Sequence, residues 1–168
     1  IIYLTKLYIY NIIIYMKSLQ YFFEKGGKMK FNIEKISSYL KNNDIRPSYQ
    51  RIKIFEYLII NKNHPTIDMM YKNLISEIPT LSKTTVYNTL NLFVEKKIAK
   101  VILVEENETR YDADTSIHGH FKCDECGEVN DLNVSIDMIN VPELKNFQIN
   151  EHHLYFKGIC SECLKKNK

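Results

Sequence analysis

The chain has 168 residues, with 23 Lys and Arg against 20 Asp and Glu and a formal net charge of +3. This length allows one domain or two small ones. Its four cysteines fall in two pairs with metal-ligand spacing and no secretion signal precedes them, which disfavours a disulfide-bonded secreted protein and indicates a reducing, cytoplasmic environment.

Residues 1–28 differ from the rest of the chain. Residues 1–16 are apolar, but the stretch is too short to span a bilayer and is interrupted by a lysine and an asparagine. It also lacks the small-residue cleavage site of a signal peptide. The first convincing start is Met29, and residues 24–28 (EKGGK) match the translation of a purine-rich ribosome-binding site. We therefore expect an untranslated leader or a disordered extension; the alternative is an amphipathic helix on a membrane surface.

Charge divides the remaining chain into two halves. Residues 29–100 contain 12 Lys and Arg against 6 Asp and Glu, whereas residues 101–168 contain 7 against 13. A basic half followed by an acidic half indicates a nucleic-acid-binding domain joined to a domain that binds cations or a partner. Random scatter of solvated charge is the alternative.

Residues 29–113 begin with two predicted helices. Ile33, Ile36 and Leu40 recur at helical spacing and predict the first one. Pro47 suits the first turn of the second helix. Apolar residues then recur along that helix, which predicts that it is largely buried: Ile52, Phe55, Tyr57, Leu58 and Ile59.

Two more helices and a hairpin follow. Thr66 suits the N-cap of a third helix that Pro79 ends, and Ser82 suits the N-cap of a fourth. The fourth helix has an inward face of Val86, Leu90, Phe93 and Val94 and an outward face of Lys83, Thr84, Thr85, Tyr87, Asn88 and Asn91. Residues 98–104 and 109–112 then alternate as two strands around a charged turn.

Helices followed by a two-stranded wing predict a winged-helix arrangement, in which the fourth helix enters the major groove of double-stranded DNA. Asn pairs with adenine there, and Tyr or Thr contacts a thymine methyl group. Basic residues, among them Lys53, suit phosphate contacts, which position a protein without reading sequence. The residues expected to contact DNA are Arg46, Arg51, Lys83, Thr84, Thr85, Tyr87 and Asn88. A generic helical bundle with a polar face is the alternative.

The acidic half contains two C-x-x-C pairs: Cys123, Cys126, Cys160 and Cys163. Four thiolates complete the tetrahedral shell of one zinc ion, which predicts a structural Zn²⁺ that joins two distant strands. His118 and His120 precede the first pair at alternate positions, so a strand would project both imidazoles to one side. Gly127 follows the pair, where it is free to take a positive φ. Unrelated reduced cysteines are the alternative; a thioredoxin-type redox pair is disfavoured because no βαβ pattern surrounds it.

Together these motifs resemble the ferric uptake regulator family. They are RPSYQR at 46–51, HPT at 64–66, KTTVYNTL at 83–90, RYD at 110–112, HGHFKCDECG at 118–127 and CSEC at 160–163. The resemblance covers residues 29–168 and implies an α+β fold, with a winged-helix DNA-binding domain over 29–113 and a small C-terminal α/β dimerisation domain over 114–168. It further implies a homodimer that binds operator DNA, without an organic substrate, an enzymatic activity or a membrane.

The resemblance also implies a regulatory metal site. The residues that match all five ligands of the family's peroxide-stress repressors are His64, Asp112, His118, His120 and Asp131. Asn88 and Asp131 favour the peroxide-sensing branch, because iron-uptake repressors usually carry Arg and Glu at these positions. Three imidazoles and two carboxylates suit Fe²⁺ or Mn²⁺ and leave one octahedral position open. In the family, the counterparts of His64 and His118 become 2-oxohistidine, and DNA is then released.

This ligand set spans both halves of the chain, so a metal ion bound to all of it fixes the angle between them. In a dimer that angle sets the spacing of the two recognition helices. A regulator that responds to iron or zinc availability would share the fold and ligands and is the first alternative. A non-haem iron enzyme and a zinc-stabilised interaction module are the others.

Two C-terminal features remain open at the level of sequence. His152 and His153 precede a predicted strand over 154–160, and one of them is a candidate for an additional metal site; otherwise they lie on the surface or at a dimer contact. The short segment 137–146 departs from the family, because Val141 and Pro142 interrupt the place where relatives carry a longer helix.

Overall fold

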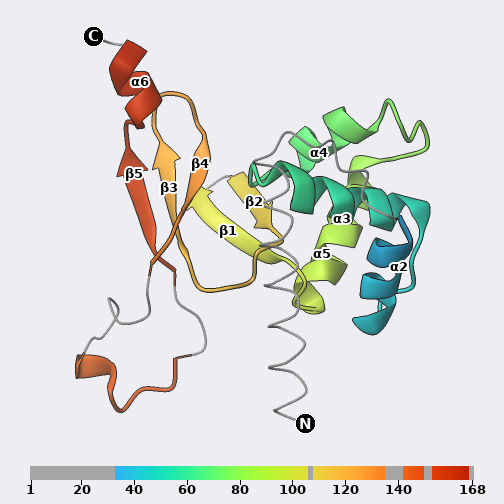
Figure 1. Cartoon of the computed structure of the whole chain (residues 1–168), viewed down its shortest axis with the longest axis horizontal. Coiled ribbons are helices and arrows are strands. Elements are labelled where there is room, and N and C mark those ends of the chain that lie inside the picture. Colours follow the sequence, from blue (N-terminus) through green and yellow to red (C-terminus); the bar gives the residue numbers. More distant parts are fainter. Residues whose placement is uncertain (1–32, 106–107, 135–141, 150–152, 167–168) are drawn as a thin grey trace. The chain divides into compact units, whose positions relative to one another are not determined.

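The computed structural model describes residues 33–105, 108–134, 142–149 and 153–166. The expected leader, residues 1–28, lies outside the described residues. Within the described ranges, four helices are followed by a strand hairpin, a three-stranded sheet and a short C-terminal helix (Figure 1). In those same ranges no helix has the length and apolar character needed to cross a membrane.

The helices that precede the first strand are α2 (Ile33–Asn42), α3 (Tyr49–Asn61), α4 (Ile67–Leu74) and α5 (Lys83–Glu95). A capping hydroxyl accepts a hydrogen bond from a first-turn N–H that has no partner inside the helix. Thr66 caps α4 in this way and Ser82 caps α5, with O···N distances of 3.2 and 3.0 Å. Both predicted caps are therefore confirmed.

Two helix ends differ from the predictions. Pro47 lies outside α3, because Ser48 is the cap and accepts a first-turn hydrogen bond at 3.3 Å. The helix α4 ends at Leu74 instead of continuing to Pro79. In the turn that follows, Ile78 N donates to Leu74 O at 2.8 Å and Ile78 is buried. The apolar spacing thus continues past the end of the helix, which is why it predicted too long an element.

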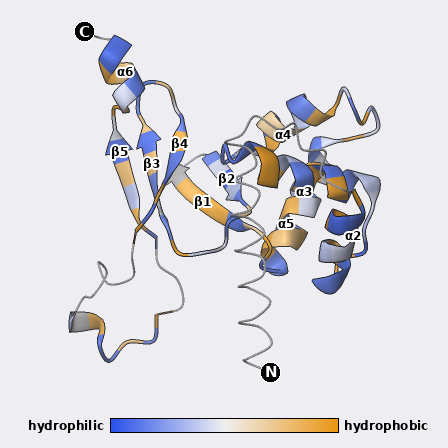
Figure 2. Cartoon of the chain, in the orientation of Figure 1, coloured by the Kyte–Doolittle hydropathy of each residue, from blue (hydrophilic) through white to orange (hydrophobic). Residues whose placement is uncertain are grey.

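The core of the helical part, residues 33–95, is built around α3 and α5, whose ribbons carry hydrophobic residues at intervals (Figure 2). Phe93 on α5 meets Phe55 on α3 edge to face, with ring centroids 5.5 Å apart, and Phe55 stacks on Tyr39 of α2 at 5.1 Å. Three of the four residues predicted to face inward on α5 are fully buried: Val86, Leu90 and Phe93. The fourth, Val94, is half-buried.

The wing consists of β1 (Lys100–Glu105) and β2 (Glu108–Asp112), which pair antiparallel and place Lys100 opposite Asp112. Tyr111 N donates to Pro65 O at 3.1 Å, so β2 is joined to the segment that leads into α4. Helices and hairpin together give the predicted winged-helix arrangement.

The C-terminal sheet has the strand order β4-β3-β5 and ends in α6. Its elements are β3 (Gly119–Cys123), β4 (Val129–Leu132), β5 (Tyr155–Gly158) and α6 (Ser161–Lys166). The central strand β3 runs antiparallel to β4 and parallel to β5. A 3-10 helix, η2 (Pro142–Leu144), occupies part of the segment 137–146 that was predicted to depart from the family, and residues 137–141 of that segment lie outside the described residues. The α+β fold is confirmed.

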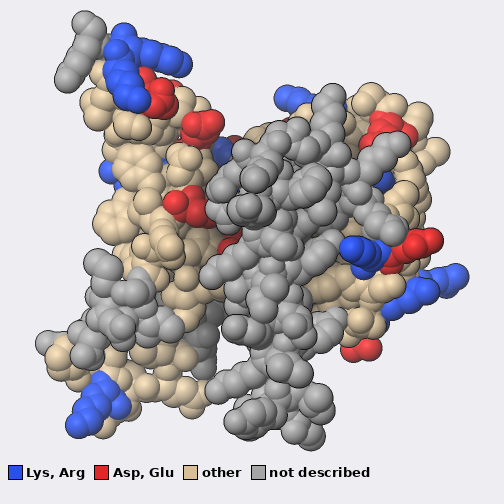
Figure 3. Space-filling model, in the orientation of Figure 1, with Lys and Arg blue, Asp and Glu red and all other residues tan. Residues whose placement is uncertain are grey.

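Charges of both signs are interspersed over the face of the helical part that Figure 3 shows. Lys53 contacts Glu56 and lies 3.0 Å from Glu77, and Lys96 lies 3.9 Å from Asp44. Part of the positive charge that the sequence assigns to this half is therefore engaged by neighbouring carboxylates.

Candidate metal centres and nucleic-acid interface

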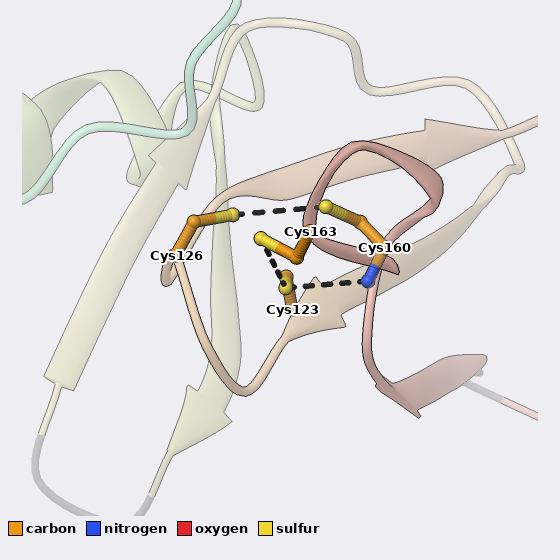
Figure 4. A group of neighbouring side chains, drawn as sticks. All are labelled: Cys123, Cys126, Cys160 and Cys163. Atoms are coloured by element: carbon orange, nitrogen blue, oxygen red, sulfur yellow. Dashed lines mark hydrogen bonds between the residues drawn. The ribbon is translucent and has the colours of Figure 1, made fainter. Parts of the chain in front are cut away.

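The four cysteines converge at one end of the C-terminal sheet (Figure 4). The sulfur atoms of Cys123 and Cys163 are 3.9 Å apart, and those of Cys126 and Cys160 are 3.8 Å apart. Tetrahedral zinc with Zn–S bonds of about 2.3 Å places neighbouring sulfur atoms roughly 3.8 Å apart. A disulfide would need about 2.05 Å. The spacing of these free thiols therefore fits a structural zinc ion.

Backbone pairing explains why two pairs so distant in sequence meet. The parallel register of β3 and β5 places Cys123 beside Gly158, and Asp124 N donates to Gly158 O at 2.7 Å. Gly127 has a φ of 71°, as predicted, and its N–H donates to Cys123 O at 3.0 Å, which closes the first turn. In the second pair, Cys160 directly precedes α6 and Cys163 lies within it, and Leu164 N donates to Cys160 O at 3.0 Å.

The protein by itself favours one thiolate in this cluster. Backbone N–H groups of Cys126 and Cys160 hold the pKa of Cys123 near 6, and Cys160 N lies 3.3 Å from its sulfur. Contact with Cys160, together with burial, raises the pKa of Cys163 above its ordinary value. Several adjacent thiolates repel one another, so a divalent cation is what makes four of them compatible.

The second cluster brings together all five residues that the resemblance assigned to a regulatory site: His64, Asp112, His118, His120 and Asp131. One donor atom from each lies within 4.8 Å of every other. His64 precedes α4, and Asp112 ends β2, whereas His118 precedes β3. His120 of β3 is the register partner of Asp131 on β4. His118 and His120 point to one side as predicted, with their Nε2 atoms 3.1 Å apart.

The distances within this cluster fit the shell of one ion. His64 Nε2 lies 2.7 Å from Asp131 Oδ1, and His118 Nε2 lies 3.0 Å from Asp112 Oδ2. Ligands with bonds of about 2.1 Å are roughly 3 Å apart when adjacent and roughly 4.2 Å apart when opposite. His64 Nε2 and Asp112 Oδ2 are buried, and neither makes a well-aligned hydrogen bond with a described residue, although each lies within 3.0 Å of another donor atom of the cluster. Because buried polar atoms need a well-placed partner, the crowding of these donors around one point is the strongest structural sign that a cation belongs here.

Contacts behind the cluster orient two of the imidazoles. His64 Nδ1 lies 3.1 Å from Val129 O, and His118 Nδ1 lies 3.1 Å from Ser116 O. A carbonyl next to Nδ1 favours a proton there and leaves the Nε2 lone pair free for a metal ion. His64 also has a φ of 45°, a left-handed conformation that is uncommon for a residue other than glycine.

The charges of the cluster are coupled. Burial opposes ionisation of Asp112 and Asp131, but contacts with His118 outweigh it and hold the pKa of both carboxyls well below the ordinary value. Burial likewise lowers the pKa of His118, but the two carboxylates raise it further, to about 9. Since a metal ion binds a neutral imidazole, metal binding would release a proton here.

Four of the seven residues predicted to contact DNA line one groove. A groove of about 470 Å³ lies between the start of α3 and α5, and the predicted residues that line it are Arg46, Arg51, Thr85 and Asn88. Tyr87 and Thr84 are exposed on α5. Lys83 instead lies 2.9 Å from Asp68 and over the ring of Tyr71, 5.9 Å from its centroid.

Sequence reasoning missed several residues next to these sites. The groove is also lined by Pro47, Ser48, Gln50 and Thr89. Arg110 Nη1 donates to His64 O at 3.2 Å, and Lys100 Nζ lies 3.6 Å from Asp112 Oδ2. The predicted hairpin could have indicated the position of Lys100, because the register of its two strands places Lys100 opposite Asp112.

Of the two candidates for an additional metal site, His152 and His153, the structure describes only His153. His153 stacks on Tyr155 with an interplanar angle of 11° and its Nδ1 lies 3.3 Å from the Tyr155 hydroxyl. His152 lies outside the described residues. Within the described part of the chain, His153 belongs to neither group of donors that fits a metal ion.

Comparisons with known proteins identify similar chains. The model of the ferric uptake regulator family matches residues 42–157. The peroxide operon regulator of Bacillus subtilis is 35% identical over 130 residues, which is 76% of this chain and 90% of that protein. The peroxide-responsive repressor PerR of Staphylococcus saprophyticus is 31% identical over 130 residues, 76% of this chain and 88% of its own. Among solved structures, the Vibrio cholerae ferric uptake regulator has a TM-score of 0.63 at 28% identity and covers 74% of this chain and 98% of its own.

Proposed function

The chain belongs to the ferric uptake regulator family, whose members are metal-dependent transcriptional regulators that bind operator DNA and are not enzymes, and we propose that it is a repressor that senses peroxide. The observation that carries this proposal is the convergence of five nitrogen and oxygen donors, which all lie within 4.8 Å of one another. Relatives at 35% and 31% identity named for peroxide support it, as do Asn88 and Asp131.

The donor set suits Fe²⁺ or Mn²⁺ in the regulatory site, and the four thiolates suit a structural Zn²⁺. His64, Asp112, His118, His120 and Asp131 would hold the regulatory ion. An ion held by these five donors would keep room for one further ligand, such as a peroxide. When bound there, Fe²⁺ supplies the electrons that reduce peroxide beside the imidazoles, whereas Mn²⁺ reacts little.

The switch follows from where the ligands stand in the chain. His64 belongs to the helical part, whereas the other four ligands begin at the end of the wing and extend into the C-terminal sheet. A metal ion bound to all five ligands would therefore fix the position of the helical part relative to the sheet. Oxidation of His64 or His118 to 2-oxohistidine weakens its donor atom, and the restraint on the helical part is lost. A ligand that favours one conformer through such differential contacts shifts the population toward it.

DNA would be bound by α5 and by the groove beside it. The N-terminal half of α5 presents Thr85, Tyr87 and Asn88, and Arg46 and Arg51 stand at the start of α3. A homodimer presents two such surfaces at a fixed distance, which must match two half-sites roughly 34–36 Å apart or a multiple of it. Double-stranded operator DNA is therefore the proposed partner.

The test combines DNA binding with mass spectrometry. The protein, loaded with Mn²⁺ or Fe²⁺, is mixed with the DNA upstream of its own gene in a gel-shift assay before and after peroxide. We expect both forms to bind, and only the Fe²⁺ form to lose binding and gain one oxygen atom on His64 or His118. His153 serves as the internal control and stays unmodified. DNA binding that follows Fe²⁺ or Zn²⁺ supply and survives peroxide would instead identify a regulator of metal uptake.

A further inference from the structure

We propose that Lys100 is an internal competitor for the regulatory metal ion, so that it sets the concentration at which the site fills. The inference rests on the proposed function, because it assumes that the five-donor cluster binds a divalent cation. Lys100 begins β1 and stands opposite Asp112, the last residue of β2. It therefore reaches the cluster from the wing, on the strand that directly follows the recognition helix α5.

The ammonium group contacts two of the proposed donor atoms. Lys100 Nζ lies 3.6 Å from Asp112 Oδ2 and 3.2 Å from His118 Nε2. The same two atoms face the centre of the cluster, where they lie 3.0 Å from each other. The lysine and a metal ion thus contact the same carboxylate oxygen and the same imidazole nitrogen. Each therefore weakens the binding of the other to these two atoms.

Charge gives the direction of the effect. Two carboxylates and a divalent cation are neutral together when the three imidazoles are neutral. Lys100 adds one positive charge a few ångströms away, and its side chain is 28% exposed, so solvent screens this charge only in part. Without the metal ion the same charge faces Asp112 Oδ2 at 3.6 Å and His118 Nε2 at 3.2 Å. With the metal ion it faces a second cation held by the same two atoms, and Lys100 therefore opposes filling of the site.

A third contact gives the competition a mechanical consequence. Lys100 Nζ donates to Ser116 O at 3.2 Å, and Ser116 belongs to the linker of residues 113–118 between β2 and β3. In the empty site Lys100 therefore ties the wing to the linker. A metal ion beside Asp112 and His118 would repel the ammonium group and weaken this tie. The lysine thus offers the linker an alternative anchor once the ion is lost.

Titration of the metal-free, zinc-containing protein with Mn²⁺ tests the proposal. K100Q and K100M remove the charge, and K100M also keeps the apolar stem. We expect both to bind Mn²⁺ roughly tenfold more tightly than the wild type. K100R keeps the charge and should bind as the wild type does.

K96Q is the matched control, because Lys96 is 32% exposed and pairs with Asp44, away from the cluster. It should leave Mn²⁺ affinity unchanged. Equal or weaker Mn²⁺ binding by folded K100Q and K100M would overturn the competition. If wild type and H118A bind Mn²⁺ alike, the proposed regulatory site itself is wrong. That outcome differs from the one in which H118A weakens Mn²⁺ binding but K100Q and K100M leave it unchanged, which would reject only the role of Lys100.

Discussion

Arg110 of β2 holds the backbone of His64: its Nη1 atom donates to His64 O at 3.2 Å. Its Nη2 atom lies 3.5 Å from Gly127 O, in the turn that carries the first cysteine pair. The side chain is buried, and it therefore links the left-handed residue that begins the regulatory cluster to the turn of the zinc cluster. Such a residue positions a ligand without touching the ion.

We expect R110Q to weaken Mn²⁺ binding by about tenfold and to lower the free energy of unfolding by about 1–3 kcal/mol, because it leaves His64 O unsatisfied in a buried place. Mn²⁺ titration and urea unfolding measure the two effects. R51Q is the control, since Arg51 donates instead to Arg46 O beside the groove. It should change neither quantity. An R110Q protein with wild-type Mn²⁺ affinity would show that the backbone of His64 needs no such support.

The zinc cluster gives a second prediction. C163S removes a buried sulfur atom and should lower the zinc content from one ion per chain toward zero. Loss of the ion should cost several kcal/mol of stability, because metal binding is coupled to folding of the knuckles. Metal analysis and thermal melting are the measurements. S161A, in the same short helix, should keep both zinc and melting temperature, whereas a stable C163S protein that retains zinc would mean that three sulfur ligands suffice.

Some features of this protein follow from local chemistry and were predictable. Thr66 and Ser82 cap their helices through hydrogen bonds that span three residues. The two cysteine pairs predict a metal site, because the spacing within each pair fits a turn around one ion. His118, directly before β3, and His120, within it, likewise face one way because alternate residues of an extended chain share a face.

Other features depend on the folded chain and could not be derived in the same way. His64 and Asp131 have no distinguishing local pattern, and only the family resemblance placed them in one cluster. The roles of Lys100 and Arg110 depend on strand register and on a carbonyl 46 residues away. The predicted helix that became α4 was drawn too long, up to Pro79, because buried apolar residues such as Ile78 continue past its end and burial does not require a helix.

Acidity should act on the metal-free and metal-loaded proteins in opposite directions. The pKa of His118 is raised to about 9 in the empty site, so its protonated form stabilises the metal-free fold. That contribution is complete below the unfolded pKa of about 6.5 and is lost as the pH rises toward 9. A metal ion has to displace the same proton, so Mn²⁺ affinity should rise up to about tenfold per pH unit over this range.

Melting of the EDTA-treated, zinc-containing protein and Mn²⁺ titration from pH 6.5 to 9 check both trends. H153Q serves as the control, because His153 contacts Tyr155 outside the cluster and should leave the profile unchanged. H118N should flatten it. A wild-type Mn²⁺ affinity that does not vary between pH 6.5 and 9 would contradict a protonated His118.

Lys83 should contribute less to DNA binding than Arg51. The sequence predicts that both contact DNA, but Lys83 Nζ lies 2.9 Å from Asp68 and over Tyr71, whereas Arg51 lines the groove beside Asn88. A basic residue that contacts a phosphate contributes about one unit to the slope of log affinity against log salt. R51Q should lower that slope by about one unit. K83Q should lower it by much less, because Lys83 pairs with Asp68 and so neutralises no phosphate.

Fluorescence anisotropy of the Mn²⁺-loaded protein, on its own upstream DNA and on unrelated DNA, measures these slopes. N88A should cost about 1–3 kcal/mol on the specific DNA and nearly nothing on the unrelated one, as expected for a residue that reads a base. D68N is the control for Lys83, since it breaks the ion pair without removing the lysine and should leave affinity unchanged or raise it. A full unit lost in K83Q would mean that Lys83 leaves Asp68 and turns to the phosphate backbone when DNA is bound.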